Sequence, residues 1–138
     1  MAEITLKGRK IPLLYTTYEM KAIQEDIAPL GKFQYLIAGR NPDNPEDTES
    51  YGSPGHLGAI ASLIRILGNA GLEEAGETAD LTDKAVLRAL KPARLAEAII
   101  VCTKAIHEGM LSEIPKDNDG GPVDVTLEEI ERKKENPG

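Results

Sequence analysis

One long apolar segment constrains how this chain can fold. Residues 55–72 are predicted to form a helix with two apolar stripes, and only Ser62, Arg65 and Asn69 make a polar line along it. The stripes consist of Leu57, Ile60, Ile64 and Leu67, and of Ala59, Leu63, Ile66 and Ala70. A helix that is apolar on most sides must be covered on most sides. The other elements are therefore expected to pack around it, unless it offers one stripe to another protein.

The chain is long enough for one domain around such a helix. It has 138 residues, of which 41% are hydrophobic and only 4% aromatic, so aliphatic and alanine side chains must fill the core. The net charge of −7 argues against a nucleic-acid-binding surface, which is usually basic. The most strongly apolar stretch runs from Leu57 to Leu67 and is interrupted by Ser62 and Arg65, so it is well short of the roughly 20 residues of a membrane span. Because no signal-peptide pattern is present and Cys102 is the single cysteine, we expect a soluble protein of a reducing, cytoplasmic compartment.

Local patterns at the N-terminal side predict a β-hairpin followed by helices. Apolar and polar residues alternate over residues 3–15, and Gly8-Arg9 is predicted to be the two-residue turn. Thr16 and Glu19 form a capping-box pattern, which predicts that a helix begins there. A further short helix is favoured over residues 32–38, although a buried strand fits the same apolar run.

The second half of the chain is predicted to be helical as well. Thr82 or Asp83 is expected to cap a short helix, and Pro92 suits the first position of a long final helix. Gly71 and Gly109 are predicted to end the two long helices, because glycine is common just after a helix C-terminus.

Two segments differ in composition from the predicted helical domain, which spans residues 1–111. Residues 40–56 are rich in proline, glycine and acidic residues and are predicted to be a mobile loop. Residues 112–138 carry eight acidic and four basic side chains, hence −4 of the net charge of −7, and are predicted to be a weakly structured tail. The predicted fold class is mainly α: a small helical domain with an N-terminal β-hairpin and a flexible acidic C-terminal tail.

No pattern predicts catalysis, a cofactor or a metal site. Cys102 and His107 lie about 140° apart around a helix, so they cannot act together as nucleophile and base. His56 falls in the predicted loop, and two histidines and one cysteine match no zinc spacing. The run Asp117-Asn118-Asp119-Gly120 lacks the spacing of a calcium loop. We expect no enzymatic activity, no cofactor and no metal, and we expect Cys102 to pack in the core.

Two features are candidate interaction surfaces. Lys84, Arg88 and Lys91 form a basic stripe at helical spacing. This stripe is either a solvated helix face or a docking site for an acidic segment, such as the tail or the acidic connector over residues 73–80. The apolar helix is either core or a surface shared with a partner. Its candidate partner-binding residues are Leu57, Ile60, Leu63, Ile64, Ile66 and Leu67.

The order of these patterns resembles that of a known family. Five segments carry the resemblance: the hairpin 4–13, the helix start Thr17-Tyr18-Glu19-Met20, the apolar helix 57–67 with its following Gly71-Leu72, the helix start Leu81-Thr82-Asp83, and the helix end His107-Glu108-Gly109-Met110. Over about residues 3–111, this layout resembles the tail assembly chaperones of long-tailed bacteriophages and of prophages in Gram-positive bacteria.

The resemblance implies a mainly helical, non-enzymatic protein of the bacterial host cytoplasm. Proteins of this family bind the phage tape-measure protein and help tail-tube protein assemble around it. A homo-oligomer is a further candidate assembly. Nucleic acid and membrane are not expected partners. In many such phages a frameshift near the end of the gene adds a second domain, and the codons of Lys133-Lys134 would suit it. Two other functions stay open: a structural head–tail connector or neck protein, and a small acidic regulatory or inhibitor protein.

Overall fold

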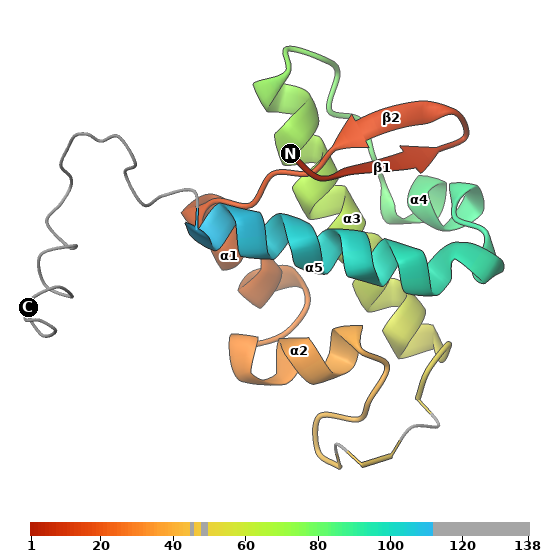
Figure 1. Ribbon diagram of the computed structural model, residues 1–138. Helices are drawn as coiled ribbons and strands as arrows, with labels where there is room; N and C mark the ends of the chain where they lie inside the picture. Colours follow the sequence, from red (N-terminus) through yellow and green to blue (C-terminus); the bar gives the residue numbers. More distant parts are fainter. Residues whose placement is uncertain (45, 48–49, 112–138) are drawn as a thin grey trace, which may run out of the picture.

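The chain folds into an N-terminal hairpin and a set of helices (Figure 1), as seen in a computed structural model that describes residues 1–44, 46–47 and 50–111. Within these ranges the elements are β1 (Glu3–Leu6), β2 (Arg9–Pro12), α1 (Thr17–Asp26), α2 (Leu30–Ile37), α3 (Pro54–Glu74), α4 (Asp83–Ala89), the 3-10 turn η1 (Pro92–Arg94) and α5 (Leu95–Leu111). The predicted mainly helical fold with an N-terminal β-hairpin is confirmed. The predicted tail, residues 112–138, lies outside the described residues.

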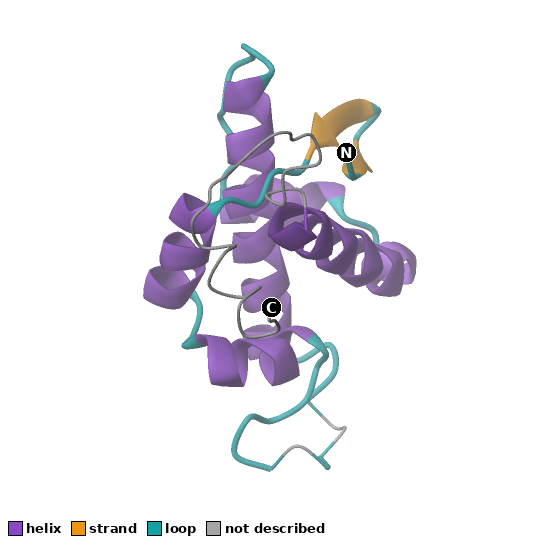
Figure 2. Cartoon of the chain, turned by 60° about the vertical axis from the view of Figure 1, so that its left-hand side comes forward, coloured by secondary structure: helices purple, strands orange, loops and turns teal. Residues whose placement is uncertain are grey.

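Helix α3 is the central element of the fold. Strand β2 and helices α1, α2, α4 and α5 all contact it, and Figures 1 and 2 show these elements arranged around it from two sides. Twelve of its 21 residues are buried. Removing apolar surface from water contributes about 25 cal/mol per Å² to folding, so this helix supplies a large share of the hydrophobic stabilisation.

The hairpin turn lies one residue earlier than predicted. Leu6 pairs with Arg9, so Lys7-Gly8 form the two-residue loop. Lys7 and Gly8 have φ angles of 51° and 78°. Two consecutive positive φ angles are what a type I′ turn requires, and this turn matches the twist of the strands. The prediction of Gly8-Arg9 as the turn is therefore wrong, although Ile4, Leu6 and Ile11 are buried as their alternation predicted.

Gly71 and Gly109 do not end their helices, contrary to prediction. They lie inside α3 and α5, which continue to Glu74 and Leu111. A Cβ atom at Gly71 would lie 1.9 Å from the Pro12 carbonyl oxygen, and one at Gly109 would lie 2.3 Å from the Tyr15 carbonyl oxygen. Glycine is needed at both positions because the backbone after β2 passes directly against the two long helices.

The predicted caps at Thr16 and Thr82 agree with the structure, whereas α2 begins at Leu30, two residues before its predicted start, and α3 begins at Pro54, one residue early. The Thr16 side chain accepts a hydrogen bond from the Tyr18 N–H at 3.2 Å, and the Thr16 N–H donates to Glu19 Oε1 at 2.9 Å, which completes the predicted capping box. Thr82 caps α4, and its hydroxyl accepts a hydrogen bond from the Ala85 N–H at 3.1 Å. Pro92 opens the turn η1, and α5 begins after it.

Candidate functional site

The apolar stripe predicted to bind a partner lies in the core. The side chains of Ile60, Leu63, Ile64, Ile66 and Leu67 are exposed by 7% or less, and Leu57 is half-buried. Their cover is supplied by the hairpin and the surrounding helices. A partner could reach the five buried side chains only if this core opened. The surface that the folded chain presents to a partner must therefore be sought elsewhere.

The polar line of α3 holds neighbouring elements in place. Ser62 Oγ donates a hydrogen bond to Asp83 Oδ2 at 2.9 Å, and Arg65 Nε donates to Asp83 Oδ1 at 2.7 Å. The Asn69 side chain makes two hydrogen bonds with the backbone of Leu81, of 3.2 and 3.0 Å. These bonds fix the connector and the start of α4 against α3, so α4 stands at a defined place beside the hairpin.

His56 is a buried structural residue and not part of a loop. It lies in the first turn of α3 and is 1% exposed. Its Nδ1 accepts a hydrogen bond from the Gly52 N–H at 2.8 Å, and its Nε2 lies 2.9 Å from the Ile37 carbonyl oxygen. With Nδ1 accepting, Nε2 must carry the proton and donate it to that carbonyl. Both ring nitrogens are thus engaged with backbone, so neither is left for catalysis or a metal.

Cys102 packs in the core, as the sequence predicted. Its side chain is 1% exposed, and burial raises the pKa of its thiol to about 12. A thiol with this pKa stays protonated at neutral pH and is a poor nucleophile. Among the residues that the structure describes, no three His, Cys, Asp or Glu side chains gather into a potential metal site. No helix in that part of the chain is long and apolar enough to cross a membrane.

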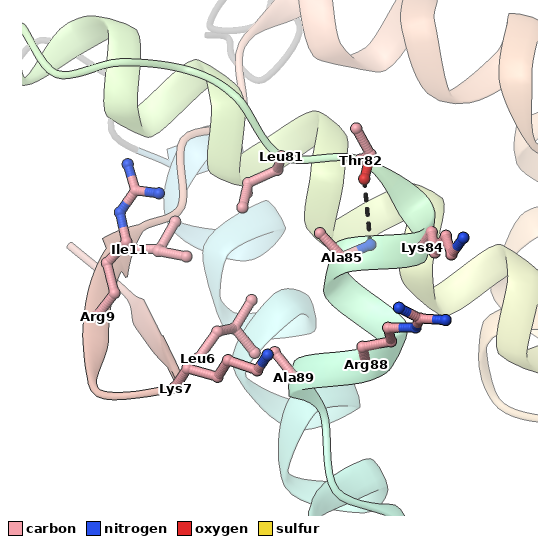
Figure 3. A pocket seen from close by; sticks show the side chains of 10 residues that line it. All are labelled: Leu6, Lys7, Arg9, Ile11, Leu81, Thr82, Lys84, Ala85, Arg88 and Ala89. Atoms are coloured by element: carbon pink, nitrogen blue, oxygen red, sulfur yellow. Dashed lines mark hydrogen bonds between the residues drawn. The ribbon is translucent and has the colours of Figure 1, made fainter.

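A groove between the hairpin and α4 combines an apolar floor with basic walls, and we call it the basic groove (Figure 3). It encloses about 520 Å³. Its lining residues are Leu6, Lys7, Arg9, Ile11, Leu81, Thr82, Lys84, Ala85, Arg88 and Ala89. Four of them are basic, five are apolar and none is acidic. The groove is therefore opposite in sign to the chain as a whole, whose net charge is −7.

The basic side chains come from both sides of this groove, and the charged ends of Lys84 and Arg88 lie on the side of α4 that is turned away from the hairpin (Figure 3). In Figure 3 the Lys7 side chain extends from the hairpin turn toward Ala89, while Lys84 and Arg88 project from α4. Within the described residues, no hydrogen bond or ion pair engages these three cationic side chains. Two members of the predicted basic stripe, Lys84 and Arg88, thus contribute to the groove.

Arg9 differs from the other cations of the basic groove because it is paired. Its guanidinium donates to Asp80 Oδ1 and to the Thr78 carbonyl oxygen, both at 3.1 Å. The acidic connector therefore meets the basic groove at the Arg9 end. The sequence could suggest the α4 stripe, but it contains no signal that Lys7 and Arg9 lie at the same groove on the hairpin side, since that depends on how the hairpin packs.

A second groove, the β1–α5 groove, lies beside the first and shares Lys7 and Ala89 with it. It encloses about 640 Å³. Its lining residues are Glu3, Ile4, Thr5, Lys7, Gly8, Ala89, Leu90, Lys91, Arg94, Glu97, Ala98 and Val101. Leu90 and Val101 are half-buried, and the next residue along α5 toward the N-terminus, Ile100, is 67% exposed. The β1–α5 groove thus offers apolar surface outside the core.

The chain matches no family model, no curated protein and no solved structure. Its own residues must therefore carry the functional conclusion. Two of its open grooves combine apolar side chains with charged edges, a composition that suits the binding of a segment from a protein chain. In the described residues, His56 and Cys102 are both committed to the interior, so neither serves these grooves as a chemical group.

Proposed function

We propose that this protein is a tail assembly chaperone of a long-tailed bacteriophage or prophage. It binds the tape-measure protein in the bacterial cytoplasm and assists the assembly of tail-tube protein, without catalysis. The order of elements supports this proposal. Along the chain come a hairpin, a helix, a central apolar helix and a final helix pair, which is the order that the resemblance implies. The observation that carries it furthest is the β1–α5 groove, together with the exposed Ile100 on the same helix α5.

A chaperone for a helical client needs apolar surface that remains open when its own core is closed. The buried face of α3 is not available for this purpose, whereas Leu90 and Val101 line an open groove. An amphipathic client helix can place apolar residues at intervals of three and four into such a groove. The acidic surplus of the chain keeps the protein soluble while this surface is exposed.

The test is co-expression with the tape-measure protein encoded in the same phage genome. Wild-type protein is expected to raise the soluble fraction of the tape-measure protein and to co-purify with it. Ile100→Glu should lower co-purification by about tenfold, because it places a charge on the client surface that must be desolvated on binding. The matched control is Tyr18→Glu, because Tyr18 is also a large exposed side chain (73%) but lies on α1, which does not line the β1–α5 groove, and it should bind like wild type. Equal binding by both variants would remove Ile100 from the client surface.

The other two candidate functions make different predictions for the virion and for the gene product. A head–tail connector remains in mature particles, so its peptides would appear by mass spectrometry of purified virions, whereas an assembly chaperone should be absent. A longer frameshifted product, detected by immunoblot of an N-terminally tagged gene with its native downstream DNA, would support the chaperone. That band should vanish with silent changes at the codons of Lys133 and Lys134, which lie outside the described residues.

A further inference from the structure

We propose that residues 123–131 of this chain dock in the basic groove between the hairpin and α4. The docking joins two parts of one molecule, and it does not depend on the client or on the function proposed above. The basic groove has positive charge that is unpaired in the described part of the chain. Three of its cations, on Lys7, Lys84 and Arg88, have no partner among the described residues, and its lining contains no acidic side chain.

The floor of the basic groove is apolar and partly open. Leu6 and Ile11 rise from the hairpin, and Leu81 and Ala85 face them from the connector and α4 (Figure 3). Ala85 is exposed and Leu81 is half-buried, whereas Leu6 and Ile11 are buried, so the open part of the floor lies on the side of the connector and α4. An occupant should therefore carry both apolar and acidic side chains, the first for the floor and the second for the walls.

Residues 123–131 have this composition. Their sequence is Val-Asp-Val-Thr-Leu-Glu-Glu-Ile-Glu, with four acidic, four apolar and no basic residues. The other acidic segment considered for the basic stripe, residues 73–80, already has a place in the structure. Its Asp80 pairs with Arg9 at one end of the groove, and in the described part of the chain no hydrogen bond or ion pair joins residues 73–80 to Lys84 or Arg88. Charge complementarity therefore favours residues 123–131 as the occupant.

The chain can reach the groove from the end of α5. Figure 1 shows α4 near the end of α5 that is opposite to Leu111. A helix of 17 residues spans about 25 Å at 1.5 Å per residue. The twelve steps from Leu111 to Val123 can extend to about 40 Å. The tether is long enough to carry residues 123–131 back along α5 to the basic groove.

A tethered segment needs only weak contacts to occupy such a site. Exposed ion pairs typically contribute about 0.2–1 kcal/mol each, which is too little to hold a separate peptide at micromolar concentration. A short flexible tether, however, gives an effective concentration of the order of millimolar. Three unpaired cations and an apolar floor suit this regime, in which the segment occupies the groove reversibly.

The test places one cysteine on the floor and one in the segment of the full chain. Ala85→Cys with Thr126→Cys should form an intramolecular disulfide under mild oxidation, measured as a faster band on a non-reducing gel. The control pair is Thr103→Cys with Thr126→Cys, because Thr103 is exposed on α5 and is 23 residues from Thr126, against 41 for Ala85. Loop closure alone favours the control pair. Docking predicts that the Ala85 pair nevertheless reacts at least about tenfold faster, because a docked segment holds residue 126 beside residue 85, above the roughly millimolar effective concentration that the tether alone gives to either pair.

The charge dependence gives the second arm of the test. Adding Lys84→Glu and Arg88→Glu to the Ala85 pair should slow its disulfide formation at least fivefold, whereas adding Lys104→Glu, on the exposed face of α5, should not. In a chain without added cysteines, Glu128→Lys with Glu129→Lys should shift the NMR amide signals of Ala85 and Ala89. Equal rates for both cysteine pairs, a rate that ignores charge reversal, or signals that shift only beyond Leu111 would each overturn the proposal. Disulfide-linked dimers in place of the intramolecular bond would overturn it too, in favour of docking between copies.

Discussion

The two ends of α3 meet the rest of the chain in different ways. At the N-terminal end, the buried ring of His56 bonds the backbone at Gly52 and Ile37 with both of its nitrogens. Toward the C-terminal end, the hairpin and α4 stand on either side of the basic groove, and three cations there have no partner among the described residues. The first end is joined by satisfied interior hydrogen bonds, whereas the second combines the close packing of Gly71 against Pro12 with charge left on the surface. Substitutions should therefore affect folding at the closed contacts and binding at the groove.

The largest effect is expected where backbone meets helix. Gly71→Ala would bring a Cβ atom to within 1.9 Å of the Pro12 carbonyl oxygen, so the strand must move away from α3. We expect a loss of at least about 3 kcal/mol in the free energy of unfolding, measured by urea denaturation. The control is Gly58→Ala in the same helix, where nothing lies within 4 Å. It should be neutral or stabilise by about 0.5–1 kcal/mol. A similar effect of the two substitutions would contradict the close packing at Gly71.

The next largest effect is expected at the closed N-terminal end. His56→Ala leaves the Gly52 N–H and the Ile37 carbonyl without partners and opens a cavity, which should cost about 2–4 kcal/mol. His107→Ala removes the same side chain from an exposed position on α5, and it should change stability by less than about 0.5 kcal/mol. If thermal denaturation finds equal midpoints for the two variants, His56 does not join α2 to α3 as described.

The third prediction concerns the pH dependence of stability that the buried Cys102 thiol causes. Burial raises the pKa of the Cys102 thiol from 9.0 to about 12. Unfolding therefore releases a proton above about pH 9. The contribution of the protonated thiol is fully present below that pH and is lost as the pH rises toward 12, at about 1.4 kcal/mol per pH unit. Between pH 9 and 10, where the unfolded thiol is only partly ionised, the wild type should lose about 1 kcal/mol more stability than Cys102→Ala. Parallel losses in urea titrations would mean that the thiol is not buried.

The smallest effect on stability is expected at the basic groove. Lys84→Glu with Arg88→Glu changes two exposed side chains that engage no partner among the described residues. The free energy of unfolding should change by less than about 0.5 kcal/mol, measured by urea denaturation. A loss of several kcal/mol would show that α4 depends on these charges for its packing, and the contrast between closed contacts and open groove would fail.

Most secondary structure could be predicted from the sequence because its signals are local. Apolar periodicity and the caps at Thr16 and Thr82 predict helices without knowledge of tertiary contacts. The hairpin turn was missed because the alternation fits both candidate turns equally well. Only the positive φ of Lys7, a residue that rarely adopts it, distinguishes the two.

The two helix glycines show where local signals stop. Gly71 and Gly109 have the residue type of a helix end, yet each is needed because distant backbone passes against it. No pattern around either position records the approach of Pro12 or Tyr15. Glycine occupies these positions because a side chain would collide with neighbouring backbone, and not because the helix ends there.

The candidate site was predictable only in the part that one helix carries. Lys84 and Arg88 lie at helical spacing, so the sequence predicts that they share a face. Lys7 joins them only because β2 and α4 both pack on α3 and so border one groove, a placement that spacing cannot reveal. His56 had a local signal that could have been used: Ser53 caps α3, and its hydroxyl accepts a hydrogen bond from the His56 N–H at 3.2 Å, so His56 had to lie in the first helical turn.

The contact between the beginning and the end of the described domain has a consequence for its synthesis. The Ala2 N–H donates to Glu108 Oε1 at 3.0 Å, and the Tyr15 carbonyl lies against Gly109. During synthesis, the packing of the hairpin can therefore be complete only after the last turns of α5 have left the ribosome. Helices α1–α4 cannot close the core one after another as they emerge, and the domain is expected to fold as a single cooperative unit once residue 109 is available.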